Sequence, residues 1–291
     1  MPNSLNILVT GTNGQLGSEI KGLSKEYKYN FFFVTKEELD ISKFEKVKVL
    51  LQEKNIGVII NCAAYTAVDK AQDDIEKANL INNLAVKNLA ELSKKSAVKL
   101  IHISTDYVFD GTNYRPYRED DLTNPCNIYG KSKHDGEKAI ININPKDSII
   151  IRTSWVYSFY GNNFVKTMIK LGKQKDKLSV IFDQIGTPTY AKDLAKTILD
   201  IIPLIKNENV EIYNYSNEGV LSWYDFAKEI MKMAKLPCVI EPIESFEYPT
   251  PSKRPYYSLL NKAKIKNRFN IKIPYWKDGL DDCLKRLGER R

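Results

Sequence analysis

Short apolar runs rich in β-branched residues alternate with longer amphipathic stretches in the first half of the chain. The runs lie at residues 6–10, 31–35, 58–63, 99–105 and 148–155. The stretches between them carry apolar residues at helical spacing, as at Val47, Leu50 and Leu51. Strands that are apolar on both faces and are separated by amphipathic helices are typical of a parallel sheet covered by helices. The pattern predicts an α/β fold with a Rossmann-like doubly wound parallel sheet.

The alternation becomes less regular after Trp155. Helices are expected near residues 162–174, 191–205 and 223–235, and strands near 178–181 and 211–216. We therefore expect a Rossmann domain over residues 1–155 and a smaller C-terminal substrate-binding domain over 156–291. Segments of about 178–213 are expected to return to the first domain.

Composition is that of an ordinary globular protein, with 43% hydrophobic and 27% charged residues. The net charge of +8 comes from lysines scattered among acidic residues, which favours a solvated surface over nucleic-acid binding. No apolar run approaches the roughly 20 residues of a membrane span, and the N-terminus lacks the features of a secretion signal. We expect a cytoplasmic protein with no membrane or nucleic-acid partner. The four cysteines are far apart, which favours free thiols over disulfides or a zinc site.

Three glycines, Gly11, Gly14 and Gly17, follow the first predicted strand and enter the first predicted helix. Glycines at such a turn allow the backbone to approach a pyrophosphate, and the helix N-terminus offers free N–H groups to it. The loop therefore predicts dinucleotide binding. Its G-x-x-G-x-x-G spacing resembles that of the extended short-chain dehydrogenase/reductase superfamily, which implies nicotinamide dinucleotide binding in the first domain and substrate binding in the second.

The end of the second predicted strand bears on the choice between NADP(H) and NAD(H). An acidic residue at this place would accept hydrogen bonds from the ribose 2′-hydroxyl and repel a 2′-phosphate. Thr35 and Lys36 are compatible with a 2′-phosphate, whereas Glu37 would support NAD(H). We expect NADPH, with NADH as the alternative.

A tyrosine with a lysine four residues later occurs twice, at Tyr129 with Lys133 and at Tyr224 with Lys228. A keto-reductase needs a proton donor at the carbonyl oxygen, and a lysine ammonium one helical turn away would lower the pKa of a tyrosine from about 10. Thr105, beside Ser104, ends a predicted strand where ligands of parallel sheets bind. We expect catalysis at the first pair and core packing at Tyr224.

With these residues in view, most of the chain resembles the dTDP-4-dehydrorhamnose reductase family. The matching segments are "VTGTNGQLGSE", "NCAAYTAVDKAQDD", "STDYVFDG", "NIYGKSKHDGEKA", "RTSWVY", "GNNFVKTM", "DQIGTPTYAKDLA" and "TPSKRP". Gln72 departs from the Ala-Glu that is commoner in the second segment. The resemblance implies NADPH-dependent reduction of a dTDP-linked 4-keto-6-deoxy sugar, dTDP-4-dehydro-L-rhamnose, to dTDP-L-rhamnose.

The resemblance also assigns roles to individual positions. It implies catalysis by Thr105, Tyr129 and Lys133. The dinucleotide is expected at Gly11, Thr12, Asn13, Gly14, Gln15, Leu16, Gly17, Thr35, Lys36, Asp40, Ile41, Ala63, Ala64, Thr66, Tyr129 and Lys133. The sugar nucleotide is expected at Val68, Thr105, Asp106, Trp155, Asn163, Gln184 and Arg254. Trp155 could instead be buried at the domain interface, and Arg254 could be a surface cation.

Two further points stay open at the level of sequence. Some relatives form dimers through a metal ion held by carboxylates, of which Glu19 would be one, but Lys192 lies where a second carboxylate would help, so we expect no metal and leave a homodimer open. The alternatives to a reductase are a dinucleotide-binding regulatory subunit like that of methionine adenosyltransferase, or a sugar-nucleotide epimerase or dehydratase. The complete Thr-Tyr-Lys set favours an enzyme, and Tyr107, where a dehydratase usually has a second acid, disfavours the dehydratase.

Overall fold

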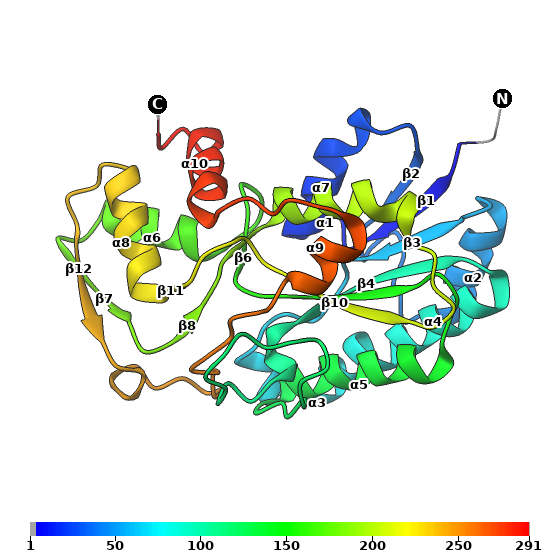
Figure 1. Ribbon diagram of the computed structural model, residues 1–291, viewed down its shortest axis with the longest axis horizontal. Coiled ribbons are helices and arrows are strands. Elements are labelled where there is room, and N and C mark those ends of the chain that lie inside the picture. The colour runs from blue at the N-terminus through cyan, green and yellow to red at the C-terminus, as the bar shows by residue number, and fades with distance from the viewer. Residues whose placement is uncertain (1–3, 291) are drawn as a thin grey trace.

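Six parallel strands form one sheet in the computed structural model, which describes residues 4–290 (Figure 1). The strands in spatial order are β2 (Asn30–Val34), β1 (Asn6–Thr10), β3 (Val58–Asn61), β4 (Lys99–Thr105), β5 (Ile149–Thr153) and β10 (Glu211–Tyr215). Every pairing in this sheet is parallel. The chain leaves β1 toward β2 and returns to the other side for β3, so the strand order reverses between β1 and β3. The predicted Rossmann-like sheet is confirmed.

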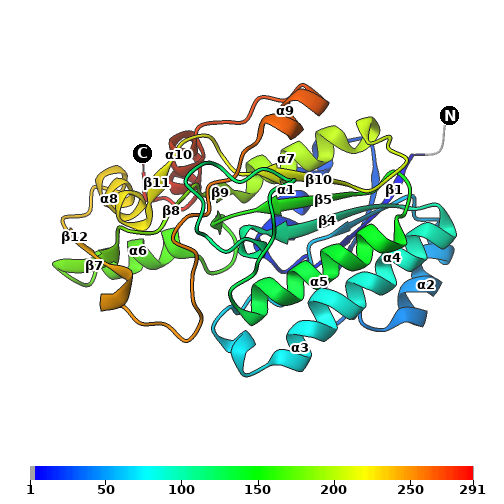
Figure 2. The same cartoon turned by 60° about the horizontal axis from the view of Figure 1, so that its bottom comes forward.

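Helices cover both faces of this sheet, as Figure 2 shows. One face packs against α1 (Gln15–Leu23), α7 (Ala191–Ile201) and α9 (Ala263–Phe269). The other packs against α2 (Phe44–Glu53), α4 (Ala85–Ser96) and α5 (Ile128–Ile143). Alternate residues of β1 enter the two cores, with Ile7 and Val9 on the first side and Leu8 on the second. This two-sided burial explains why the strands are continuous apolar runs.

The helical stretch between β3 and β4 ends in three consecutive segments. The short α3 (Ile75–Asn79) continues through one π-helical turn (Leu80–Leu84) into α4. The helix α5 packs against the π-helical turn at Gly136, where an added Cβ atom would overlap the carbonyl oxygen of Asn82. A glycine is therefore required at this crossing for the two helices to approach so closely.

A smaller layered unit lies beyond one end of the large sheet, at the left of Figure 1. It contains α6 (Phe164–Gly172), β7 (Lys177–Ile181), α8 (Trp223–Met233), β12 (Val239–Ile243) and α10 (Trp276–Arg286). The strands β7 and β12 pair in parallel. Residues such as Phe226, Ile230 and Leu280 form its separate hydrophobic core.

Two further short strand pairings occur outside the large sheet. The strand β6 (Val156–Tyr157) pairs with β9 (Thr189–Tyr190), and β8 (Ile185–Gly186) pairs with β11 (Leu221–Ser222). Within the span 178–213, α7 packs on the large sheet and β10 begins as its edge strand, whereas β7 pairs with β12. None of the helices in residues 4–290 has the length and apolar character needed to cross a membrane.

The crossing at Gly136 gives a test of the packing. Gly136→Ala should lower the free energy of unfolding by about 1–3 kcal/mol, because the methyl group forces the two helices apart. Gly22→Ala is the matched control in α1, where the new methyl group would meet only the Tyr160 hydroxyl at 3.6 Å. This control should be neutral or should raise stability by up to about 1 kcal/mol, since alanine favours helix more than glycine does. Urea unfolding measures the free energy of unfolding of both variants. Equal changes in the two variants would contradict the close packing at Gly136.

Candidate active site

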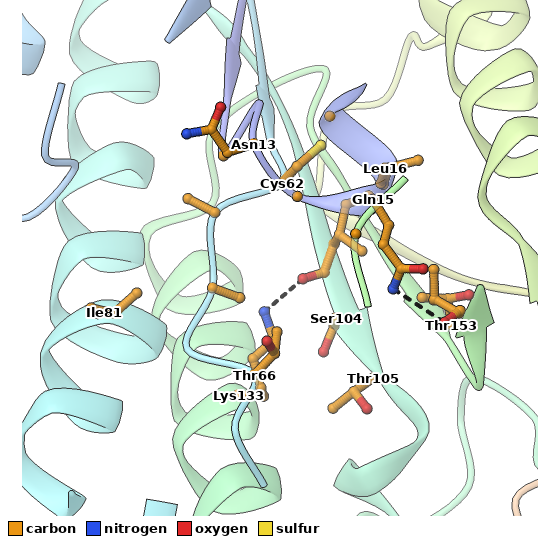
Figure 3. Close-up of a pocket in the computed structure, with 18 of the residues that line it drawn as sticks. Asn13, Gln15, Leu16, Cys62, Thr66, Ile81, Ser104, Thr105, Lys133 and Thr153 are labelled. Carbon is orange, nitrogen blue, oxygen red and sulfur yellow. Dashed lines mark hydrogen bonds between the residues drawn. The ribbon is translucent and has the colours of Figure 1, made fainter. Parts of the chain in front are cut away.

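A cavity of about 750 Å³ lies at the carboxyl edge of the large sheet, where the strand order reverses. Residues predicted to bind the cofactor or substrate, or to act in catalysis, line it from several elements. They are Gly11, Asn13, Gly14, Gln15, Leu16, Gly17, Lys36, Asp40, Ile41, Ala63, Ala64, Thr66, Val68, Thr105, Asp106, Tyr129, Lys133 and Trp155. Figure 3 shows Ser104, Thr105 and Lys133 grouped on one side of this cavity, across from Asn13 and Gln15.

The glycine loop between β1 and α1 forms one wall. Gly11 has a positive φ of +66°, and a Cβ atom there would lie 2.6 Å from the backbone nitrogen of Ala63 on the loop after β3. Gly14 is the N-cap of α1, and its backbone N–H donates to the carbonyl oxygen of Gly11 at 3.0 Å. The loop is thus tightly closed, and the N-terminus of α1 begins beside the cavity, as an anion site requires.

Opposite charges lie at the far end of the cavity, just after β2. Both Lys36 and Glu37 line it, whereas Thr35 does not. The backbone N–H of Thr35 donates to a carboxylate oxygen of Glu38 at 2.7 Å, which fixes the turn. Asp40 and Ile41 line the same end. A ligand phosphate there would meet one cation, Lys36, and two anions, Glu37 and Asp40.

The helix α5 places Tyr129 in its first turn and Lys133 one turn later. Its N-cap is Asn127, whose side-chain oxygen accepts a hydrogen bond from the backbone N–H of Gly130 at 2.8 Å. This cap fixes where the helix begins. Tyr129 is 9% exposed and Lys133 only 1%, so both reach the cavity from within the fold.

Burial raises the pKa of Tyr129 to about 12, although the Thr105 hydroxyl beside it acts in the opposite direction. This is the reverse of the fall that the sequence led us to expect. Lys133 does not offset the effect of burial, because its ammonium donates to the carbonyl oxygen of Ile103 at 2.6 Å and no hydrogen bond joins it to Tyr129 among the described residues. Burial also lowers the pKa of Lys133 to about 8, against the raising effect of Glu137. At neutral pH the phenol therefore keeps its proton.

Thr105 and Asp106 lie at the end of β4 beside Tyr129. The Thr105 hydroxyl donates to one carboxylate oxygen of Asp106 at 3.0 Å. Burial raises the pKa of Asp106 to about 7. The other carboxylate oxygen of Asp106 and the hydroxyl of Ser104 are buried without a hydrogen-bond partner among residues 4–290. Because buried polar groups are normally paired, these atoms are suited to meet polar groups of a ligand.

Trp155 lines the cavity from the other side. It has a left-handed backbone conformation with φ of +48°, which is unusual for a bulky residue. Its ring stacks on that of Trp223 at a centroid distance of 3.7 Å. Strained residues of this kind cluster at ligand sites. The ring of Trp155 is therefore held in one position. It faces the cavity from the segment between the large sheet and the smaller unit.

Three of the expected substrate residues make contacts within the protein instead of lining the cavity. Asn163 caps α6, and its amide donates to Gln15 at 3.0 Å. Gln184 is buried and donates to the hydroxyl of Ser245 at 3.0 Å. Arg254 forms a two-bond ion pair with Asp69, at 3.1 and 2.9 Å. Thr12 and Thr35 are the expected cofactor residues that also do not line it.

Other lining residues were not among the site residues expected from the sequence, although Glu37 was considered for NAD(H) and Ser104 was considered beside Thr105. They are Glu37, Leu39, Cys62, Ile81, Ile103, Ser104, Tyr107, Thr153, Val156, Gly161, Asn162 and Leu194. Several of them follow the carboxyl ends of β3, β4 and β5, and this position is a signal that could have identified them. Leu194 lies on α7, which packs on the large sheet, and Gly161 lies just before α6, so sequence spacing alone does not place either residue at the cavity.

Glu19, the carboxylate considered for a metal site, is buried and paired inside the chain. Its oxygens accept hydrogen bonds from Arg286 at 2.8 and 3.0 Å and from the Ser158 hydroxyl at 2.6 Å. Within residues 4–290 no group of three or more His, Cys, Asp and Glu side chains is arranged to hold a metal ion. The pair joins α1 of the large unit to α10 of the smaller one.

Comparisons with known proteins agree with this geometry. The family model described as "RmlD substrate binding domain" matches residues 5–289. The dTDP-4-dehydrorhamnose reductase of Aggregatibacter actinomycetemcomitans is 41% identical, over 94% of this chain and 96% of that protein.

Two solved structures extend the likeness to three dimensions. A dTDP-4-dehydrorhamnose reductase from Clostridium acetobutylicum is 40% identical and superposes with a TM-score of 0.92, over 98% of this chain and all of that one. The dTDP-4-dehydrorhamnose reductase from Bacillus anthracis, solved in complex with NADP, is 37% identical with a TM-score of 0.92, over 97% of this chain and 99% of that one. The chain therefore belongs to the dTDP-4-dehydrorhamnose reductase family, which confirms the resemblance seen in its sequence.

Proposed function

We propose that this protein reduces the 4-keto group of dTDP-4-dehydro-L-rhamnose to give dTDP-L-rhamnose, with NADPH as the hydride donor. The observation that supports this most is that the glycine loop and the set Thr105, Tyr129 and Lys133 line one cavity. A dinucleotide bound at the loop and a keto sugar at Tyr129 would then share one enclosed space. The reductase relatives at about 40% identity support the same substrate class.

The residues around the loop fit a nicotinamide dinucleotide. The tight turn at Gly11 and the N-terminus of α1 provide N–H groups for a pyrophosphate. Lys36 could pair with a 2′-phosphate at the other end of the cavity, and the Bacillus anthracis relative was solved with NADP. When bound, NADPH would supply the hydride; the chain's own residues orient the ketone and manage the proton.

Tyr129 is proposed as the proton donor to the keto oxygen. Its raised pKa keeps the phenol protonated at neutral pH, as an acid catalyst requires. Thr105, whose hydroxyl affects the pKa of Tyr129, would hold the same keto oxygen from the neighbouring strand end. As the proton leaves, negative charge forms on the phenolate.

Lys133 would stabilise that charge. Its ammonium has three N–H donors, of which one binds the carbonyl oxygen of Ile103 and a second lies 3.2 Å from the Nε2 atom of His102. The third is available on the side of the cavity that Lys133 lines. A small movement of the Lys133 ammonium toward Tyr129 would bring the cation to the phenolate. This would lower the pKa of Tyr129.

The remaining expected substrate residues are assigned by position. Val68, Asp106 and Trp155 line the cavity and would contact the sugar nucleotide, with Trp155 offering a flat apolar face. Asn163 and Gln184 would act from behind this wall. Arg254 would have to exchange Asp69 for the substrate diphosphate.

The other reaction classes fit the site less well. A dinucleotide-binding regulatory subunit has no need of Thr105, Tyr129 and Lys133 together at one cavity. A dehydratase would usually place a second acid after Asp106, where this chain has Tyr107. Neither class of protein would consume NADPH when it is given dTDP-4-dehydro-L-rhamnose, whereas a reductase would.

Tyr129→Phe removes one oxygen and keeps the ring, so the fold and dinucleotide binding should persist. The turnover number for dTDP-4-dehydro-L-rhamnose should fall by about 10²–10⁴, as expected for a lost general acid. The rate at which NADPH absorbance is lost measures the turnover number. The matched control is Tyr224→Phe, since Tyr224 also precedes a lysine by four residues but is partly buried against the core of the smaller unit. A dead Tyr224→Phe variant, or an active Tyr129→Phe variant, would contradict the assignment.

Lys36→Ala tests the cofactor preference. It should reduce kcat/KM with NADPH by about tenfold, equivalent to roughly 1.4 kcal/mol, and leave kcat/KM with NADH almost unchanged. Glu37→Ala is the control at the adjacent position and should not lower kcat/KM with NADPH. The wild-type protein should prefer NADPH, and a tenfold preference for NADH would rule out the proposed role of Lys36.

Arg254→Ala tests the proposed contact with the diphosphate. Substrate binding should weaken by roughly 1.5–3 kcal/mol, the usual range for a hydrogen bond to a charged group, and NADPH affinity should hardly change. Lys253→Ala is the control, because Lys253 is the adjacent cation and is exposed. Calorimetry measures both affinities. If the two variants bind substrate equally well, Arg254 serves only to pair with Asp69.

A further inference from the structure

His102 is a completely buried histidine that the proposed reaction does not use. It lies in β4, three residues before Thr105, and is absent from the cavity wall. Its Nε2 atom is 3.2 Å from the Nζ atom of Lys133. The histidine therefore lies behind the lysine, on the side away from the cavity.

A row of buried polar side chains continues from His102 across the sheet. The Nδ1 atom of His102 lies 3.0 Å from the side-chain nitrogen of Asn61 on β3. The side-chain oxygen of Asn61 accepts a hydrogen bond from the Thr10 hydroxyl on β1 at 2.6 Å. Thr10, Asn61 and His102 are each no more than 1% exposed. Such a row inside an apolar sheet is costly unless every member is hydrogen-bonded.

The charge state of His102 follows from this environment. Burial, together with the nearby charge of Lys133, holds the pKa of His102 well below its usual value, so the imidazole is neutral at pH 7. A neutral imidazole has one donor nitrogen and one acceptor nitrogen, whereas an ammonium group only donates. His102 can therefore accept one hydrogen bond from Lys133 while adding no second positive charge.

We propose that His102 is a positioning residue for Lys133: its Nε2 atom accepts one ammonium N–H, the Ile103 carbonyl oxygen accepts another, and the third is left directed at the cavity. This inference rests on the proposed function for the role of Lys133 in reduction. The contact itself is independent of that role, because it is a matter of distance and burial.

The row also explains how Lys133 keeps a partner in either charge state. When Lys133 is an ammonium, Nε2 accepts, Nδ1 carries the proton, and the Asn61 amide turns its oxygen toward Nδ1 and its nitrogen toward Thr10. When Lys133 is a neutral amine, Nε2 can donate to it, Nδ1 accepts from Asn61, and Thr10 donates to the amide oxygen. The two amide orientations differ only by exchange of nitrogen and oxygen, so both fit the same space.

The ionisable groups that act on the pKa of Lys133, Glu137 and Cys62, have pKa values well away from its own. Glu137 on the same helix remains ionised, because Arg152 outweighs the cost of its burial and lowers its pKa to about 2. Burial raises the pKa of Cys62, on the loop after β3, to about 12, and that of Tyr129 to about 12. Asp106, with a pKa of about 7, interacts with Tyr129 and bears on the acidic limb of a pH profile. We therefore expect a transition near pH 8 to report Lys133.

The test compares two substitutions of His102 in the full-length protein. His102→Leu removes the acceptor, which disfavours the ammonium form, so the pKa of Lys133 should fall by about one unit. His102→Gln should recover most of this shift, because its side-chain oxygen can reach the position of Nε2. Carbon-13 NMR of labelled lysine, with the Lys133 signal assigned from Lys133→Met, measures the pKa directly. The basic limb of the kcat profile should move by the same amount, with a smaller effect on the KM for NADPH.

Leu100→Ala is the matched control, because Leu100 is equally buried in β4, two residues away. It should lower stability through the cavity that it leaves but should not move the pKa of Lys133. An unchanged pKa in His102→Leu, or an equal fall in His102→Gln, would overturn the positioning role. If the wild-type protein reduces no dTDP-linked keto sugar, the proposed function fails, and the NMR titration still decides the role of His102.

Discussion

The parallel alignment of β1, β3 and β4 is the constraint on which the site depends. Parallel strands end at one edge of the sheet, and the reversal of strand order between β1 and β3 opens a space there. The backbone at Gly11 comes so close to Ala63 that a Cβ atom would not fit. This contact fixes the glycine loop against the end of β3, and the cavity lies between that loop and the end of β4.

Burial of Lys133 is the second demand on the fold. An ammonium group without partners is costly to bury, which is why its pKa falls to about 8 even though the Ile103 carbonyl oxygen and His102 contact it. The negative charge of Glu137 raises that pKa from one turn further along α5, and Arg152 keeps Glu137 ionised through two hydrogen bonds at 3.0 and 2.8 Å. The helix, two strands and the polar row behind them thus act together on one side chain.

Much of the fold could be predicted from the sequence, because two-sided burial of parallel strands leaves continuous apolar runs and the glycine spacing has a direct backbone meaning. We could expect Tyr129 and Lys133 at one site because residues four apart in a helix lie on the same face, one turn apart. The partners of Arg254 and Gln184 could not be predicted, since Asp69 and Ser245 are far from them in sequence. The raised pKa of Tyr129 was missed for a similar reason: spacing places a lysine nearby, but only the fold decides which acceptor its ammonium contacts. The boundary at residue 155 and the assigned binding roles stay predictions.

The central claim is that hydride reaches the 4-keto carbon of a dTDP-linked sugar in the cavity beside Tyr129. The most direct measurement supplies NADPH deuterated at C4 of its nicotinamide together with dTDP-4-dehydro-L-rhamnose, and examines the product by NMR. The account predicts dTDP-L-rhamnose with deuterium bound at C4 of the sugar. A protein that binds NADPH yet leaves the keto sugar unreduced, or a product without deuterium at that carbon, would contradict it.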